Sequence, residues 1–167
     1  MNPLTEKQLR DSLVNATRSE RQRLLPPDLA EVRWDRLEYL GWRDRKQPLA
    51  AYVVTWVDDT PVGVLLRSND GTGRRRAAMC AWCEDVVATN DVQLYVAKRG
   101  GAAGRNGDTI GTLICNEFHC SRNARRRPTF AEAGSDDEGV RAAIIERRVD
   151  SLRDRVRRFL DEVRRTA

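Results

Sequence analysis

The chain has 167 residues, of which 33 % are charged and 6 % aromatic, and its formal net charge is +5. This length suits one domain with a hydrophobic core or two small lobes that share an interface. No apolar stretch approaches the roughly 20 residues of a membrane span, and the first residues lack the basic and apolar segments of a secretory signal. We therefore expect a cytoplasmic protein with no membrane partner, in a compartment that disfavours disulfides.

The positive charge is concentrated in one part of the chain. Between residues 74 and 127 the sequence has ten basic and five acidic side chains, while the remaining residues carry 20 of each sign. A basic segment of this kind implies an anionic partner, either nucleic acid or an acidic protein surface. Plain solubility is the simpler alternative.

The first part of the chain predicts one helix followed by a β-hairpin. Thr5 to Gln8 has the pattern of a capping box, and apolar residues follow at helical spacing, so we expect a helix from about Thr5 to Ser19. Residues 34–42 fit either a strand or an irregular segment. Residues 49–67 are rich in β-branched and aromatic residues on both sides of a polar turn, which predicts an antiparallel hairpin.

A second hairpin is predicted further along. Residues 92–97 alternate as a strand, residues 100–107 form a flexible glycine-rich connection, and residues 109–114 return as the partner strand.

The last part of the chain has the clearest helical pattern. After an acidic linker over residues 131–139, with a capping-box candidate at residues 135–138, apolar residues recur at steps of 4, 3, 4, 3 and 4. We expect this helix to pack on its own domain, against the first helix, in a monomer; a dimeric coiled coil is the alternative. The apolar positions are Ile145, Val149, Leu152, Val156, Phe159 and Val163.

All four cysteines occur in two close pairs. Cys80 and Cys83 enclose two residues, Cys115 and Cys120 enclose four, and 31 residues separate the pairs. Two pairs that flank a hairpin predict a tetrahedral zinc ion held by four thiolates. Cys115 at a strand end and Cys120 in a following helix would form a treble clef. Two disulfides, four unrelated core thiols, and His119 in place of Cys120 are the alternatives.

Four thiolates fill the coordination sphere of zinc, so the ion is predicted to be structural. The single histidine, His119, offers no convincing catalytic dyad or triad, and the glycines of residues 100–104 lack the ending of a phosphate-binding loop, so we expect no enzyme. The predicted fold class is α+β: antiparallel β-hairpins with a treble-clef zinc finger, flanked by an N-terminal helix and a long C-terminal helix. Residues 1–73 and 74–167 are the expected segments of one compact unit.

A basic surface is predicted around the metal. Zinc would bring Arg74, Arg75 and Arg76 close to the arginines that follow the second cysteine pair, and Trp82 between two ligands is expected to be exposed. The alternative for Trp82 is packing on the hairpin. The predicted partner contacts are Trp82, Arg122, Arg125 and Arg126.

The cysteine layout resembles the C-terminal treble-clef zinc finger of the elongation factor G-binding proteins, the group that includes the fusidic acid resistance proteins. Residues 2–8, 15–18 and 34–44 are similar to short members of this group from high-GC bacteria, and the chain's 27 arginines against 3 lysines fit such genomes.

This resemblance implies a zinc-stabilised domain that binds elongation factor G and aids its release from the ribosome, without modifying fusidic acid. It carries the ligand role to Cys80, Cys83, Cys115 and Cys120. The resistance proteins have a larger N-terminal helical bundle, so a housekeeping role at the ribosome is an equal alternative to drug protection. A ribosomal or other RNA-binding zinc module, which uses the same arginines, is the competing interpretation.

Overall fold

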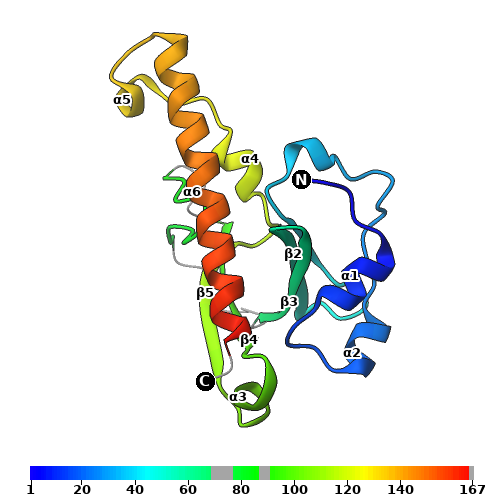
Figure 1. Ribbon diagram of the computed structural model, residues 1–167. Helices are drawn as coiled ribbons and strands as arrows, with labels where there is room; N and C mark the ends of the chain where they lie inside the picture. The colour runs from blue at the N-terminus through cyan, green and yellow to red at the C-terminus, as the bar shows by residue number, and fades with distance from the viewer. Residues whose placement is uncertain (69–76, 87–90, 166–167) are drawn as a thin grey trace.

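The computed structural model describes residues 1–68, 77–86 and 91–165. A single five-stranded sheet in the order β1-β2-β3-β4-β5 runs through the molecule, and every neighbouring pair is antiparallel (Figure 1). The predicted α+β fold class is confirmed. The strands are β1 (Leu40–Arg43), β2 (Ala50–Val57), β3 (Thr60–Ser68), β4 (Val92–Lys98) and β5 (Thr109–Cys115).

Both predicted hairpins form. β2 and β3 pair from Ala50↔Arg67 to Val57↔Thr60, which leaves a two-residue turn in which Asp58 has φ 53°. Aspartate tolerates this left-handed conformation, which tight hairpin turns require. β4 and β5 pair from Val92↔Cys115 to Lys98↔Thr109. Within the described residues, β3 and β4 share only two pairs, Arg67↔Val96 and Ser68↔Tyr95.

The prediction of one N-terminal helix is wrong, because the chain forms two short helices, α1 (Glu6–Ser12) and α2 (Arg18–Arg23). Between them Leu13 bridges Gly63 of β3, and the Val14 N–H donates to the Gly63 carbonyl over 2.9 Å. A new capping box at Thr17 then starts α2. The tertiary contact with the sheet therefore outweighs helical spacing at this point.

Asn15 in this break ties the sheet together. Its amide donates to the carbonyls of Leu65 in β3 and Lys98 in β4, both over 2.9 Å, and its Oδ1 accepts from the Leu65 N–H. One side chain thus bridges the two hairpins where their own ladder is short.

The connections hold more helix than expected. A short helix, α3 (Gly101–Arg105), stands where the glycines predicted a flexible connection, and α5 (Phe130–Ala133) interrupts the predicted linker. Within α3, Gly104 is needed because a Cβ at this position would lie 1.7 Å from the Arg99 carbonyl oxygen. The other helices are η1 (Trp34–Arg36), α4 (Cys120–Ala124) and α6 (Glu138–Arg164), which is capped by Asp137.

The long helix packs as predicted on its own domain, but on β3, β5, α4 and α5 rather than on α1 (Figure 1). Its predicted apolar side is buried except for Ile145, which is half-buried. The monomeric state stays a prediction. No helix among the described residues is long and apolar enough to cross a membrane.

Two hydrophobic cores lie on opposite faces of the sheet. Successive residues of β2 divide between them, since Val53 joins one core while Tyr52 and Val54 join the other. The cysteine-side core contains the four cysteines and the buried side of α6; the N-terminal core contains Leu9 and Leu13. The predicted boundary at residues 73 and 74 separates β1–β3 from β4–β5 within one sheet, and independent folding of the two segments stays a prediction.

Candidate metal centre

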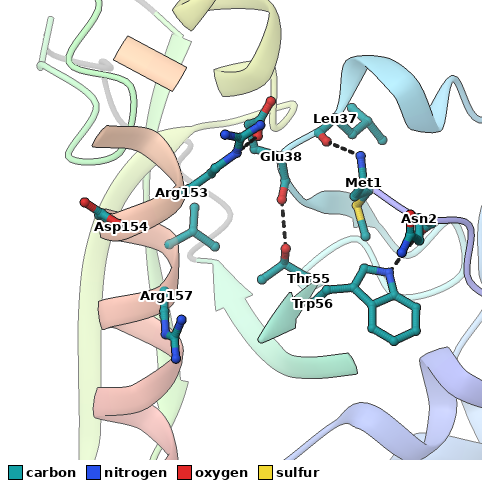
Figure 2. A pocket seen from close by; sticks show the side chains of 10 residues that line it. Met1, Asn2, Leu37, Glu38, Thr55, Trp56, Arg153, Asp154 and Arg157 are labelled. Atoms are coloured by element: carbon teal, nitrogen blue, oxygen red, sulfur yellow. Dashed lines mark hydrogen bonds and ion pairs between the residues drawn. The ribbon is translucent and has the colours of Figure 1, made fainter. Parts of the chain in front are cut away.

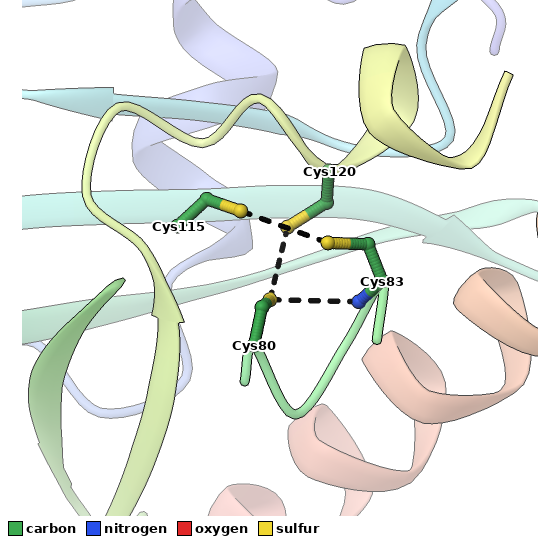
Figure 3. A group of neighbouring side chains, drawn as sticks. All are labelled: Cys80, Cys83, Cys115 and Cys120. Carbon is green, nitrogen blue, oxygen red and sulfur yellow. Dashed lines mark hydrogen bonds between the residues drawn. The ribbon is translucent and has the colours of Figure 1, made fainter. Parts of the chain in front are cut away.

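The four cysteine sulfurs form one compact, buried group. All four Sγ atoms lie within 4.8 Å of one another, and two of the pairs, Cys80 with Cys120 and Cys83 with Cys115, are 3.6 Å apart (Figure 3). A disulfide requires about 2.05 Å, so the sulfurs are not paired covalently. Tetrahedral zinc with Zn–S bonds of about 2.3 Å places its sulfurs about 3.8 Å apart. The two 3.6 Å separations are therefore close to those around zinc.

Backbone geometry places the first cysteine pair. The N–H groups of Trp82 and Cys83 donate to the Cys80 sulfur over 3.4 and 3.5 Å. The Ala81 N–H donates to the Leu113 carbonyl over 2.7 Å, which fastens this turn to β5. Glu84 closes the turn with φ 50°.

The second pair lies as the sequence predicts. Cys115 is the last residue of β5, and Cys120 is the first residue of α4. Between them Phe118 adopts φ 57°, which reverses the chain from strand to helix. A tight turn, a hairpin and a helix that supply two ligand pairs make up a treble clef.

The four thiol groups together favour a bound cation. Hydrogen bonds from Cys115 and Cys120 lower the pKa of the Cys80 thiol, while those with Cys115 and Cys80 raise the pKa of Cys120. These opposite directions arise because crowded thiolates repel one another unless a cation neutralises them. Asn123 adds an amide N–H directed at the Cys115 sulfur over 3.4 Å.

His119 lies outside this group. It precedes the first residue of α4, and its Nδ1 is 3.2 Å from the Arg122 guanidinium. The metal-binding group found among the described residues consists of the four cysteines alone. The alternative with His119 as ligand is thus not supported.

A family model for the FBP C-terminal treble-clef zinc finger matches residues 8–163. The chain belongs to this family. No curated protein and no solved structure matched the chain. With four buried thiolates as ligands, the zinc of this FBP-family protein is structural, and its binding free energy contributes directly to folding.

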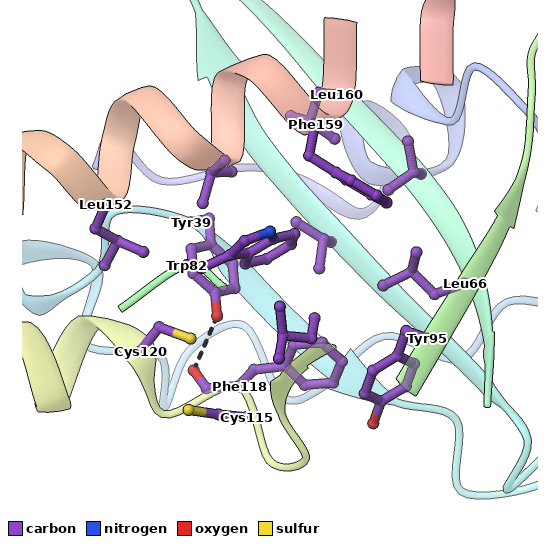
Figure 4. Packing of buried hydrophobic residues seen from close by; sticks show 14 of the residues in the cluster. Tyr39, Leu66, Trp82, Tyr95, Cys115, Phe118, Cys120, Leu152, Phe159 and Leu160 are labelled. Atoms are coloured by element: carbon purple, nitrogen blue, oxygen red, sulfur yellow. Dashed lines mark hydrogen bonds between the residues drawn. The ribbon is translucent and has the colours of Figure 1, made fainter. Parts of the chain in front are cut away.

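The prediction that Trp82 is exposed is wrong. The side chain is only 2 % exposed and lies between the sheet and α6 (Figure 4). Its ring meets Tyr39 edge-on at 5.1 Å between centroids and Phe159 of α6 at 5.6 Å. The finger shares its core with the sheet and α6, so the ring can be buried fully. The Trp82 side chain is therefore not at the surface of the folded chain.

The predicted arginines differ in how they are held. Arg122 is exposed on α4. Arg125 is half-buried and paired with Glu38, whereas Arg126 binds Asp85 at 2.9 Å and Glu132 at 2.7 Å. Arg74, Arg75 and Arg76 lie outside the described residues.

Glu38 is a central residue that the sequence pattern did not single out. Its side chain is 3 % exposed and pairs with Arg125 of the finger and Arg153 of α6. It also lines a pocket of about 450 Å³, in which Figure 2 shows it beside Arg153 and Thr55. The Thr55 hydroxyl donates to the Glu38 carbonyl over 2.8 Å. No periodicity or motif marks such a residue, since its partners are distant in sequence.

Proposed function

We propose that this protein binds translation elongation factor G and modulates its release from the ribosome. The observation that carries the proposal is the family match over residues 8–163 together with a complete four-cysteine centre. A saturated structural zinc supports a binding role, because no coordination position is left for a substrate or an activated water. We therefore infer no catalytic activity, and we infer a cytoplasmic location beside the ribosome.

The charge arrangement favours a protein partner over RNA. Two of the arginines expected to face a partner, Arg125 and Arg126, are neutralised by buried or half-buried carboxylates of the same chain. RNA binding depends on cations that remain free to contact phosphates. Of the predicted contact residues we retain Arg122 as a partner contact, because Arg125 is paired with Glu38 and Arg126 keeps α5 in position through Glu132.

Titration calorimetry of zinc-loaded protein against purified elongation factor G tests the proposal. We expect one-to-one binding at micromolar or lower Kd that persists at moderate salt. Absence of binding by a folded, zinc-loaded sample would contradict it. Absorbance at 260 nm of the purified protein, and binding to ribosomal RNA that weakens steeply with salt, would favour the RNA-binding alternative.

A further inference from the structure

A second pocket lies at the junction of the finger with the segment that precedes β1. It measures about 420 Å³, and its walls come from residues 33–37 on one side and residues 118–125 on the other. The Glu38 N–H donates to the buried Ser121 hydroxyl over 3.0 Å, and Glu38 also pairs with Arg125. These contacts hold the two walls in a fixed relation.

The rim of this pocket is basic. Among the described residues that line it are four arginines and His119, and none of them is acidic. Arg33, Arg36 and Arg122 are exposed, and Arg36 forms a solvent-exposed ion pair with the adjacent Asp35 at 3.3 Å, whereas the charge of Arg125 is balanced by the buried Glu38. Three guanidinium groups therefore surround the opening, which suits a ligand that carries carboxylates.

The floor of the pocket, by which we mean its apolar lining, is held in place by packing. Leu37 and Phe118 contribute to it, and the Phe118 ring packs on Tyr95 at 5.3 Å between centroids. A Cβ at position 41 would lie 2.6 Å from the Phe118 ring, so Gly41 permits this ring position. A preformed floor lowers the cost of ordering a bound side chain.

This combination favours a peptide over a nucleic acid. Phe118 is only 7 % exposed, so its ring does not offer the open face on which an RNA base stacks. An apolar floor inside a basic rim instead matches an apolar side chain flanked by acidic residues. Such anchors in small pockets commonly dominate the affinity of protein interfaces.

We propose that the Leu37–Phe118 pocket receives an apolar side chain from an acidic segment of the protein partner. The inference rests on the proposed function only in taking elongation factor G as the source of that segment. It adds Arg33 and Arg36, outside the zinc finger itself, to the binding surface.

The test uses two synthetic peptides, an acidic one with a central phenylalanine and the same peptide with serine at its centre. Calorimetry compares the wild type, the double variant Arg33→Glu/Arg36→Glu, and a control with the same charge change at exposed positions of α6, Arg147→Glu/Arg158→Glu. Zinc content and thermal melts establish that all three are folded. We expect the phenylalanine peptide to bind the wild type and the control, and to lose about tenfold or more in affinity with the pocket variant.

Three results would overturn the proposal. The first two are equal affinity of the wild type for the two peptides, and equal affinity of the wild type and the pocket variant for the phenylalanine peptide. The third is that oligouridylate displaces the phenylalanine peptide at a lower concentration than the serine peptide does. Parallel titrations with elongation factor G separate the two inferences. If the pocket variant still binds elongation factor G as the wild type does, the inference about the pocket is refuted and the proposed function is retained. If the wild type binds the phenylalanine peptide but not elongation factor G, the proposed function is refuted and the inference about the pocket is retained.

Discussion

The two faces of the sheet are stabilised by different means. The N-terminal core is closed by α1 and the residues that flank it through apolar packing, around Leu9 and Leu13, which are fully buried. The cysteine-side core is closed by the 27-residue helix α6 and by the four metal ligands, which belong to the core itself. One sheet thus joins a core that requires a metal to one that contains no metal ligand, so the two should respond differently to the same perturbation.

The tryptophans report on the two cores separately. Trp34, Trp42 and Trp56 belong to or pack against the N-terminal core, whereas Trp82 lies in the cysteine-side core. A chain with tryptophan only at position 82, and the converse Trp82→Phe variant, therefore give fluorescence signals from opposite faces of the sheet.

Zinc removal should have the largest effect. Structural zinc contributes on the order of 10 kcal/mol in small zinc domains, so a strong chelator, or the Cys115→Ser substitution, should unfold the finger. Trp82 emission should shift to the red before the other three tryptophans respond. Simultaneous shifts at every chelator concentration would show that the two cores unfold as one unit, which breaks the comparison.

Trp82→Ala should be the most damaging change that leaves the ligands intact. Removing a buried tryptophan costs about 3–5 kcal/mol, because the cavity left behind is only partly filled. Urea unfolding followed by circular dichroism measures the loss, and Trp82→Phe, which retains an aromatic ring, should lose less. If Trp82→Ala were as stable as the wild type, the ring would not join the finger to α6.

Leu9→Ala sharpens the comparison from the other side. The residue is fully buried in the N-terminal core, and such truncations cost about 2–5 kcal/mol. We expect a lower free energy of unfolding with unchanged zinc affinity, measured by competition with a chromophoric chelator. A marked fall in zinc affinity would reveal coupling of the two cores through the sheet.

Glu132→Gln should have the smallest effect, with a defined pH dependence. Hydrogen bonds from Arg126, and then from the Thr129 backbone, hold the pKa of Glu132 well below its ordinary value of 4.5. A carboxylate whose pKa is lowered by folding stabilises the protein above pH 4.5, and this contribution is lost as the pH falls further.

At pH 7 we expect Glu132→Gln to cost about 1 kcal/mol, and the difference from the wild type should narrow in melts below pH 4.5. Glu146→Gln, at an exposed position on α6, is the matched control and should show no such trend. A loss that stayed constant with pH would mean that the charge of Glu132 has no part in it.

The sequence predicted what depends on local spacing. The two cysteine pairs, both hairpins and the apolar side of α6 each follow a short period, and each is present in the structure. The metal centre was predictable because Cys115 and Cys120 fall at the junction of a strand and a helix. The break of the first helix at Leu13 was not, because it depends on a contact with Gly63, fifty residues away.

Burial and ion pairing were also beyond the sequence. The finger considered alone would leave Trp82 exposed, and its burial comes from contacts with Tyr39 and with Phe159 of α6. The same holds for the arginines, since Glu38 meets Arg125 and Arg153 across 87 and 115 residues. A count of charges locates a basic segment but does not say which guanidinium groups are already neutralised.

Because the ladder between β3 and β4 is short, α6 reinforces the sheet by contacting both hairpins. Arg157 of this helix pairs with Asp58 in the turn of the first hairpin, and the Val163 carbonyl accepts from the Gly100 N–H at the end of the second. A force that peels α6 away would remove both attachments, while the two ladder pairs, the Asn15 hydrogen bonds and contacts such as that of Arg43 with Asn116 would still join the two halves of the sheet. An unfolding motor that pulls on α6 would thus have to break the attachments of this helix to both hairpins before it could separate them.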